Sequence, residues 1–357
     1  MSAVLNPSTP AELADAVRSA PRVLAVGAGT KGRLAAVGAD VVRISTAGLK
    51  GIVEYEPSEF TFTALAGTPV RDIENVLAEQ GQYLPFDALW VEAGATIGGT
   101  VAAGVSGPGR FRFGGLRDFI LGVRFVDGEG RLLRMGGKVV KNAAGFDLPK
   151  FFVGSLGRFG ALAEVTFKVF PRAVAVKTLR WDVPDAGALT TILTAAAGAR
   201  WELDALEASP AESAVYARLA GPAEALDGLA AEMLARWPGR VLGAEQASAL
   251  WRGVREFAWA HDGGELVKVV LVPSQVAAVL EAVQRVPGAR VWIGAGGNVA
   301  WVSLPRGARL GEKWAWPALT MRGTGPLWPG GRQEAAVGRA VKAALDPQGR
   351  FPGLEEF

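Results

Sequence analysis

The stretch AVGAGTKG, residues 25–32, has glycines at positions 27, 29 and 32 in the spacing G-x-G-x-x-G. Backbone N–H groups in such a loop can converge on an anion, because glycine leaves the backbone open and tolerates positive φ. The chemistry that the loop predicts is phosphate or pyrophosphate binding. The same spacing also opens the dinucleotide-binding βαβ unit, and it occurs in tight turns that bind nothing.

The elements around this loop argue against the βαβ unit. RVLAV (22–26) predicts a short buried strand that ends at the loop, and VVRIS (41–45) predicts the next strand. Only RLAAVGAD (33–40) separates the loop from the second strand, whereas a crossover helix needs a connection of about a dozen residues or more. Asp40 also comes too early for the ribose-binding carboxylate, which is expected about 20 residues on. We therefore expect a glycine-rich loop between two strands and no Rossmann domain.

The residue types that the chain lacks limit its chemistry further. It has no cysteine and a single histidine, His261. This excludes disulfides, iron–sulfur clusters ligated by this chain, and a metal site with two imidazoles. His261 could act as a base paired with Asp262, or it could lie in a surface turn. Catalytic residues stay unassigned, and no metal site is expected.

Length and composition are those of a folded globular protein of two lobes, or of one domain with an insertion. The 357 residues are 50% hydrophobic and 20% charged, and the net charge of +3 is too small to indicate nucleic-acid binding. The apolar runs are interrupted before the roughly 20 residues of a membrane span. MSAVLNPSTP lacks the basic and apolar regions of a signal peptide. We expect a cytoplasmic protein without a transmembrane segment.

Capping and turn patterns outline the elements. Residues 9–20 predict a helix with Thr9 as N-cap and Glu12 closing a capping box, and Thr68–Pro69 start a helix that ends at Gly81. Strands are predicted on both sides of EPSE within 51–67, in a hairpin turned at Asp127–Gly128, and over 157–170 before Pro171. Residues 174–295 alternate helices such as 222–237 with strands such as 265–273, which is typical of an α+β lobe. A last helix is expected over 332–345.

Four segments resemble one known family, in the same order. They are VGAGTKG, TIGGTVAAGVSGPGRFRFGGLRDFILGVRFVDGEG (96–130), KVVKNAAGFDLPKFFVGSLGRFGALAEVTFKV (138–169) and AALDPQGRFPG (343–353). The family is that of the flavoproteins of the vanillyl-alcohol oxidase type, whose FAD domain is also called PCMH-type. Within it, the chain is most similar to the smaller flavin-binding subunits of bacterial glycolate oxidases. The resemblance covers the first 170 residues and the last 25.

The resemblance implies an α+β fold, with a PCMH-type FAD-binding domain of two α+β subdomains and an inserted α+β cap lobe. The expected boundaries are 1–172 for the FAD-binding domain, 173–325 for the cap or substrate lobe, and 326–357 for a C-terminal segment that returns to the FAD domain.

It also implies non-covalent FAD, because no histidine precedes the glycine loop for covalent attachment. The pyrophosphate would lie against the backbone of Gly27, Ala28, Gly29, Thr30 and Lys31. The other side would be lined by Gly98, Gly99, Thr100, Ser106 and Gly107, with Gly114, Asp118, Gly160 and Leu162 as further positions near the cofactor. Any single glycine among these could instead serve a turn or a bulge.

The chain departs from the family pattern at three places. Phe146 stands where the family has tyrosine, Arg158 and Phe159 replace threonine and leucine in GSLGRFG, and Phe351–Pro352–Gly353 lacks the family's asparagine. Each change could reshape a flavin contact, but none removes the glycine backbone.

The implied function is FAD-dependent oxidation of a 2-hydroxy acid, glycolate to glyoxylate, within a hetero-oligomer. The implied partners are a larger flavin-binding catalytic subunit and an iron–sulfur subunit, through which the chain could be peripheral to the inner membrane. The alternative is a structural or electron-relay subunit with catalysis on another chain. Arg110, Arg112 and Arg117 could bind a substrate carboxylate, an FAD phosphate or a partner, or form a solvated face. Some of the 11 tryptophans could mark a partner interface, although core packing accounts for most of them.

Overall fold

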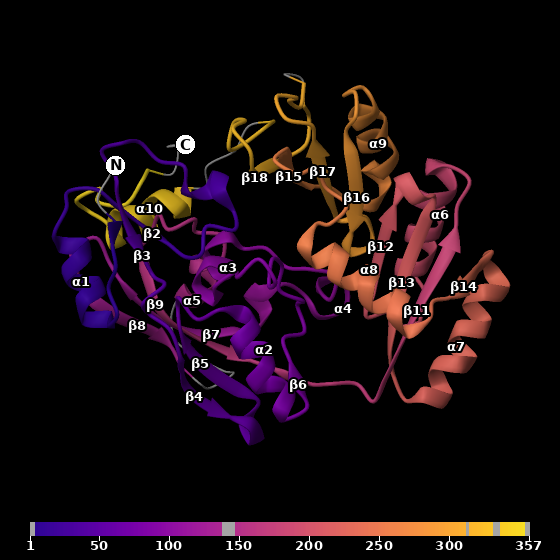
Figure 1. Ribbon diagram of the computed structural model, residues 1–357, viewed down its shortest axis with the longest axis horizontal. Helices are drawn as coiled ribbons and strands as arrows, with labels where there is room; N and C mark the ends of the chain where they lie inside the picture. The colour runs from indigo at the N-terminus through magenta and orange to yellow at the C-terminus, as the bar shows by residue number, and fades with distance from the viewer. Residues whose placement is uncertain (1–3, 138–146, 312–313, 331–335, 354–357) are drawn as a thin grey trace. The chain divides into compact units, whose positions relative to one another are not determined.

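The computed structural model describes residues 4–137, 147–311, 314–330 and 336–353. The chain divides into two compact units (Figure 1). Unit 1 comprises Met1–Val105, Gly115–Pro171 and Gln333–Phe357, and unit 2 comprises Ser106–Gly114 and Arg172–Arg332. The short segment 106–114 therefore belongs with the second half of the chain.

The glycine loop of unit 1 follows a strand of a small parallel sheet. The strands β1 (Val4–Leu5), β2 (Val23–Val26) and β3 (Val42–Ser45) lie in the order β1-β3-β2. Between β2 and β3 the chain makes only the glycine loop, the 3-10 turn η1 (Gly32–Ala35) and a short connection. The expectation of a loop without a Rossmann crossover helix is confirmed, because the two strands are direct neighbours.

A five-stranded antiparallel sheet forms the rest of the unit 1 framework. Its order is β4-β5-β9-β7-β8, with bounds β4 (Ile52–Glu56), β5 (Thr61–Leu65), β7 (Ile120–Val126), β8 (Leu132–Gly136) and β9 (Ala161–Lys168). The predicted strands around EPSE and the hairpin after Val126 are confirmed. Pro171 does not end the strand region: β10 (Phe170–Pro171) pairs with β6 (Gln82–Tyr83). Proline is tolerated there because this ladder has only two strands.

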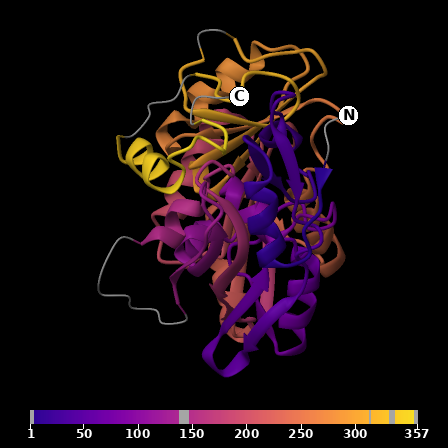
Figure 2. The same cartoon turned by 90° about the vertical axis from the view of Figure 1, so that its left-hand side faces the viewer.

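Helices α1 (Pro10–Arg18), α2 (Val70–Glu79), α5 (Leu148–Phe152) and α10 (Ala336–Leu345) accompany these sheets, and Figure 2 shows α10 in yellow. Thr9 caps α1 by accepting the N–H of Glu12, as predicted. The Glu12 carboxylate also accepts from the N–H and the hydroxyl of Ser8, each at 2.8 Å. This bonding lowers the pKa of Glu12 below its usual value.

A helix that the sequence did not reveal lies in the glycine-rich segment. The helix α3 (Ile97–Ala103) starts at Thr96, whose hydroxyl accepts the N–H of Gly99, and ends at Gly104 with φ of 64°. Its two glycines disfavour a helix intrinsically, so tertiary packing must supply the stability. Ile97 and Val101 are fully buried in that packing.

Unit 2 is built on an eight-stranded antiparallel sheet of order β14-β11-β13-β12-β16-β17-β15-β18. The strands are β11 (Ala175–Asp182), β12 (Ala205–Ser209), β13 (Ala214–Gly221), β14 (Gly239–Val241), β15 (Glu265–Val270), β16 (Arg290–Gly294), β17 (Val299–Leu304) and β18 (Ala318–Arg322). Helices α6 (Ala186–Ala197), α7 (Ala223–Arg236) and α9 (Val276–Gln284) pack on one face and bury the main core of the unit. On the other face, α8 (Ala244–Glu256) is anchored by Trp251, which donates to the hydroxyl of Thr178.

No helix among the described residues is both long and apolar enough to cross a membrane.

Candidate functional site

Two adjoining cavities in unit 1 lie where β2, α3 and the entry to β9 meet. The first encloses about 520 Å³ of space partly open to solvent, and the second about 360 Å³. Both are lined by Ala25, Gly27, Gly99, Ala102 and Gly157. The segments that the sequence analysis assigned to the cofactor therefore converge, although they are far apart in the chain.

The glycine loop forms one wall of the first cavity. Residues 25–31 all line it. A Cβ on Gly27 would collide with the hydroxyl of Thr96, the N-cap of α3, so glycine is required for the loop to approach this helix. Gly29 has φ of 71°, and a Cβ added there would have no atom within 4 Å, so the backbone here faces open space. That arrangement is suited to a ligand that approaches the backbone directly.

The helix α3 forms the opposite wall. Gly99 lines both cavities and Gly98 lines the second. A Cβ on Gly98 would lie 2.7 Å from both the Cβ and the carbonyl oxygen of Ala66, the residue that follows β5. Glycine at this position is therefore needed for α3 to pack against the end of β5. Gly98 was expected from the sequence to line the cofactor, and helix packing is the constraint that the structure shows for it.

Buried polar atoms in this region fit a polar ligand. Among the described residues, the hydroxyls of Thr100 and Ser155 are buried and have no hydrogen-bond partner. Ser155 lines the second cavity. Buried hydroxyls are normally satisfied, so the unsatisfied hydroxyl of Ser155 points to a partner supplied by a bound group. Thr100 lines neither cavity.

Lys31 adds a positive charge to the first cavity. Its side chain is buried, and its ammonium lies 4.8 Å from the centre of the Trp90 ring. Trp90 has φ of 58°, a strained conformation for an aromatic residue, and strain of this kind is concentrated at functional sites. The sequence analysis assigned only the backbone of Lys31, whereas the structure shows that its side chain also borders the cavity.

The remaining predicted residues lie in different places. Gly160 and Leu162 line the second cavity. Asp118 accepts the N–H of Gly115 at a turn and does not line either cavity. Ser106, Gly107 and Gly114 belong to unit 2. Phe146 lies outside the described residues.

The three arginines named from the sequence are also separated. Arg112 pairs with Glu202, at 2.9 Å between Nη2 and Oε2, and Arg117 is exposed on unit 1. Arg110 starts α4 (Arg110–Phe113), which contacts β12. The ring of Phe111 packs this helix against Gly296. A Cβ added to Gly296 would lie 2.5 Å from that ring.

Arg110 lies near a lysine that the sequence analysis missed. Lys268 is partly buried on β15, opposite Trp301 of β17 and Leu319 of β18. Burial, and then the Arg110 guanidinium, lowers the pKa of Lys268 from 10.5 to about 8. Among the described residues neither side chain makes a hydrogen bond or an ion pair, so the two cations form an uncompensated positive site in unit 2.

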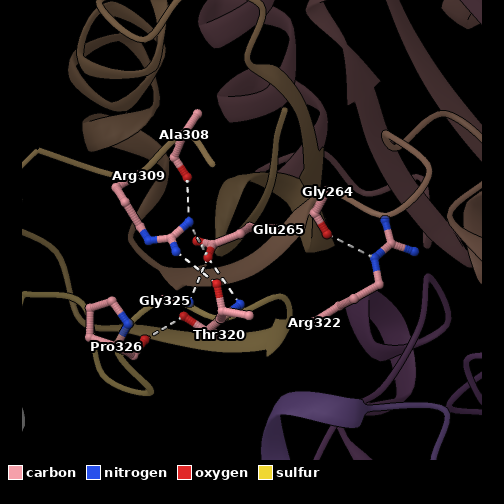
Figure 3. A network of polar contacts seen from close by, with 9 residues as sticks. Gly264, Glu265, Ala308, Arg309, Thr320, Arg322, Gly325 and Pro326 are labelled. Atoms are coloured by element: carbon pink, nitrogen blue, oxygen red, sulfur yellow. Dashed lines mark hydrogen bonds and ion pairs between the residues drawn. The ribbon is translucent and has the colours of Figure 1, made fainter. Parts of the chain in front are cut away.

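The acidic residue on the same strand does not neutralise this site. Glu265 accepts from the guanidinium of Arg309 at 2.7 Å and from the backbone N–H groups of Thr324 and Gly325 (Figure 3). Arg322, on the neighbouring strand, is directed away from Glu265 and donates to the carbonyl of Gly264. The Glu265 carboxylate is therefore bound by other groups and not by Lys268.

His261 shows no catalytic arrangement. Its Nε2 lies 2.7 Å from the carbonyl oxygen of Gly288, and its backbone N–H donates to Ser303. These contacts fix a turn beyond α8. Within the described part of the chain, no group of three or more histidine or acidic side chains could hold a metal ion.

Comparison with known proteins agrees with this geometry. Residues 1–136 match the family described as the FAD binding domain. This match covers 136 of the 357 residues. FAD is accordingly the cofactor of the chain, and the glycine loop, the unsatisfied hydroxyl of Ser155 and Lys31 fit a ligand with a pyrophosphate and polar groups.

Relatives of the FAD-binding domain are similar over part of their length. The glycolate oxidase subunit GlcE of Escherichia coli (strain K12) is 40% identical over 210 residues, covering 58% of this chain and 56% of that protein. The glycolate oxidase subunit GlcD of Bacillus subtilis (strain 168) is 32% identical over 128 residues, covering 36% of this chain and 27% of that protein. The chain thus matches about half of the first relative and about a quarter of the second.

The fold extends beyond the FAD-binding domain. A solved structure of alkyldihydroxyacetonephosphate synthase superposes with a TM-score of 0.72 at 15% identity, covering 98% of this chain and 77% of that one. At this identity the likeness shows the fold alone, and it shows it for both units.

Proposed function

We propose that this chain is the FAD-binding subunit of a glycolate oxidase-type complex and oxidises a 2-hydroxy acid, glycolate to glyoxylate. When bound, FAD accepts the hydride that leaves the substrate carbon. The observation that carries the proposal is the FAD-binding domain together with similarity to subunits GlcE and GlcD. We further propose that unit 2 is the cap or substrate lobe.

In this proposal the chain contributes positively charged side chains that bind the substrate. A 2-hydroxy acid brings a carboxylate that needs a cationic partner, and arginine and lysine both form charge-assisted hydrogen bonds to carboxylates. Arg110 and Lys268 supply two positive charges without a bonded carboxylate among the described residues. We propose that they hold the substrate carboxylate, which fits an anionic substrate better than a neutral alcohol.

The proposed complex includes a larger flavin-binding catalytic subunit and an iron–sulfur subunit. The chain has no cysteine, so onward electron transfer through a cluster needs another polypeptide. A cytoplasmic location is proposed with this assembly.

A second candidate function is that of a structural or electron-relay subunit. The observation that favours it is the state of His261, the single histidine of the chain, whose ring contacts a backbone carbonyl. Removal of the hydroxyl proton would then depend on another residue type or another chain.

The spectrum of the FAD-loaded chain, recorded before and after anaerobic addition of glycolate, separates the two functions. Bleaching of the flavin bands by glycolate, with no response to ethanol, is the expected result. Bands that persist with the isolated chain but bleach with the assembled complex would assign catalysis to a partner and support the second function.

A further inference from the structure

The C-terminal segment contacts the cofactor region through one lysine. Lys342 of α10 lies with its ammonium 2.9 Å from the carbonyl oxygen of Arg158, 2.9 Å from that of Phe351 and 3.2 Å from that of Pro352. The carboxylate of Asp346 completes the set at 2.5 Å. Two of the three departures from the family sequence, at Arg158 and at Phe351–Pro352, therefore meet at the same ammonium group.

The carbonyl that Lys342 holds lies between residues that line both cavities. Leu156 and Gly157 precede Arg158 and line the first cavity, and Gly160 follows it and lines the second. Leu156 has φ of 53° and Gly157 has φ of 73°. For leucine this left-handed conformation costs about 1–2 kcal/mol, so contacts from elsewhere must hold it.

The same segment is fastened to the strand that leads into the glycine loop. Asp346 is buried and accepts the N–H groups of Arg350 and Phe351, which folds the tail back on α10. The carbonyl of Arg350 then accepts the N–H of Val23, the first residue of β2, at 2.8 Å. In Figures 1 and 2 this tail is the yellow end of the chain.

We propose that Lys342 is a positioning residue for the FAD site: it fixes the wall formed by residues 156–160, and the C-terminal segment thereby sets the affinity for FAD and the environment of the bound flavin. A lysine suits this task because one ammonium can donate to several carbonyls at once. The inference rests on the cofactor and does not depend on the substrate.

The test compares Lys342→Met, Lys342→Arg and Arg339→Gln in the full chain. Arg339→Gln is the control, since it removes a positive charge from an exposed position on the same helix. The measurements are FAD titration of the apo-protein, visible circular dichroism of the flavin at saturating FAD, and thermal unfolding of the apo-protein.

We expect Lys342→Met to bind FAD at least tenfold more weakly and to alter the visible dichroism at saturation, with recovery in Lys342→Arg and no change in Arg339→Gln. A lower melting temperature alone does not support positioning. If Lys342→Met unfolds more easily but binds FAD with wild-type affinity and dichroism, the lysine is purely structural and the proposal is wrong.

Should Lys342→Met fail to fold, Lys342→Gln is measured instead, because its shorter, neutral side chain cannot donate to all three carbonyls at once. Wild-type affinity and dichroism in that variant, together with wild-type values in Lys342→Arg, would overturn the proposal. A wild-type chain that takes up no FAD would overturn it together with the cofactor assignment. Failure of glycolate to bleach the flavin affects only the proposed function, because no substrate enters this experiment.

Discussion

Replacing Lys268 with methionine is expected to stabilise the folded protein at neutral pH. The lysine is protonated and partly buried on β15, near the guanidinium of Arg110. Both burial and like charge disfavour the ammonium form in the folded state. Methionine keeps most of the side-chain length and removes the charge, so the variant loses this penalty.

The size and the pH range of the effect follow from the pKa. Folding lowers the pKa of Lys268 from 10.5 to about 8, and this difference corresponds to about 3 kcal/mol at 1.36 kcal/mol per unit. The folded state releases the proton near pH 8, whereas the unfolded chain keeps it until pH 10.5. The wild-type protein therefore gains stability relative to the variant as the pH rises from about 8 to 10.5, and it bears the full penalty below pH 8.

Urea unfolding of the wild type and of Lys268→Met between pH 7 and pH 10.5 measures the difference in their free energies of unfolding. The titration of all other groups is common to the two proteins and cancels in this difference. The control is Lys177→Met, because Lys177 lies in the same sheet but pairs with Asp227. That variant is expected to lose at most about 1 kcal/mol, as for other surface ion pairs. A Lys268→Met variant that is less stable than wild type at pH 7, or a difference independent of pH, would refute the reasoning.

Three further predictions concern the cofactor cavities and α3. Lys31→Met is expected to weaken FAD binding by about tenfold or more, as for loss of a charge-assisted hydrogen bond. The melting temperature of the apo-protein is expected to stay the same. Equal FAD affinity of variant and wild type in a fluorescence titration would contradict this prediction. Gly98→Ala is expected to lower the free energy of unfolding of the apo-protein in urea by about 1–3 kcal/mol, since the added Cβ would lie 2.7 Å from Ala66. Gly29→Ala, at an open position, is expected to cost about 1–2 kcal/mol of backbone strain. Unchanged stability in Gly98→Ala would contradict the packing role of Gly98. Thr100→Val is expected to leave apo stability unchanged or higher, because the buried hydroxyl has no partner among the described residues. A marked loss of apo stability would show that the hydroxyl is already satisfied.

Sequence patterns predicted the elements whose signals are local. The short connection between RVLAV and VVRIS excluded a crossover helix, and the structure places β2 and β3 side by side. Turn residues marked the strands of the unit 1 sheet, and Thr9 marked the start of α1. These features depend on a few neighbouring residues, so a single sequence carries them.

The features that were missed depend on distant partners. The helix α3 contains adjacent glycines at 98 and 99 and forms because it packs against β5, which no local propensity reveals. Lys268 lies in an apolar run that reads as a buried strand, and its role depends on Arg110, more than 150 positions earlier in the chain. Lys342 likewise meets Arg158 only in the folded protein.

The most direct test of the account is uptake of FAD by the purified chain, followed by its visible spectrum after removal of free cofactor. The account predicts one FAD per chain, bound non-covalently and released on acid denaturation, with weaker binding in Lys31→Met. A folded protein that stays colourless and takes up no added FAD would contradict the assignment of the two cavities in unit 1 to a flavin.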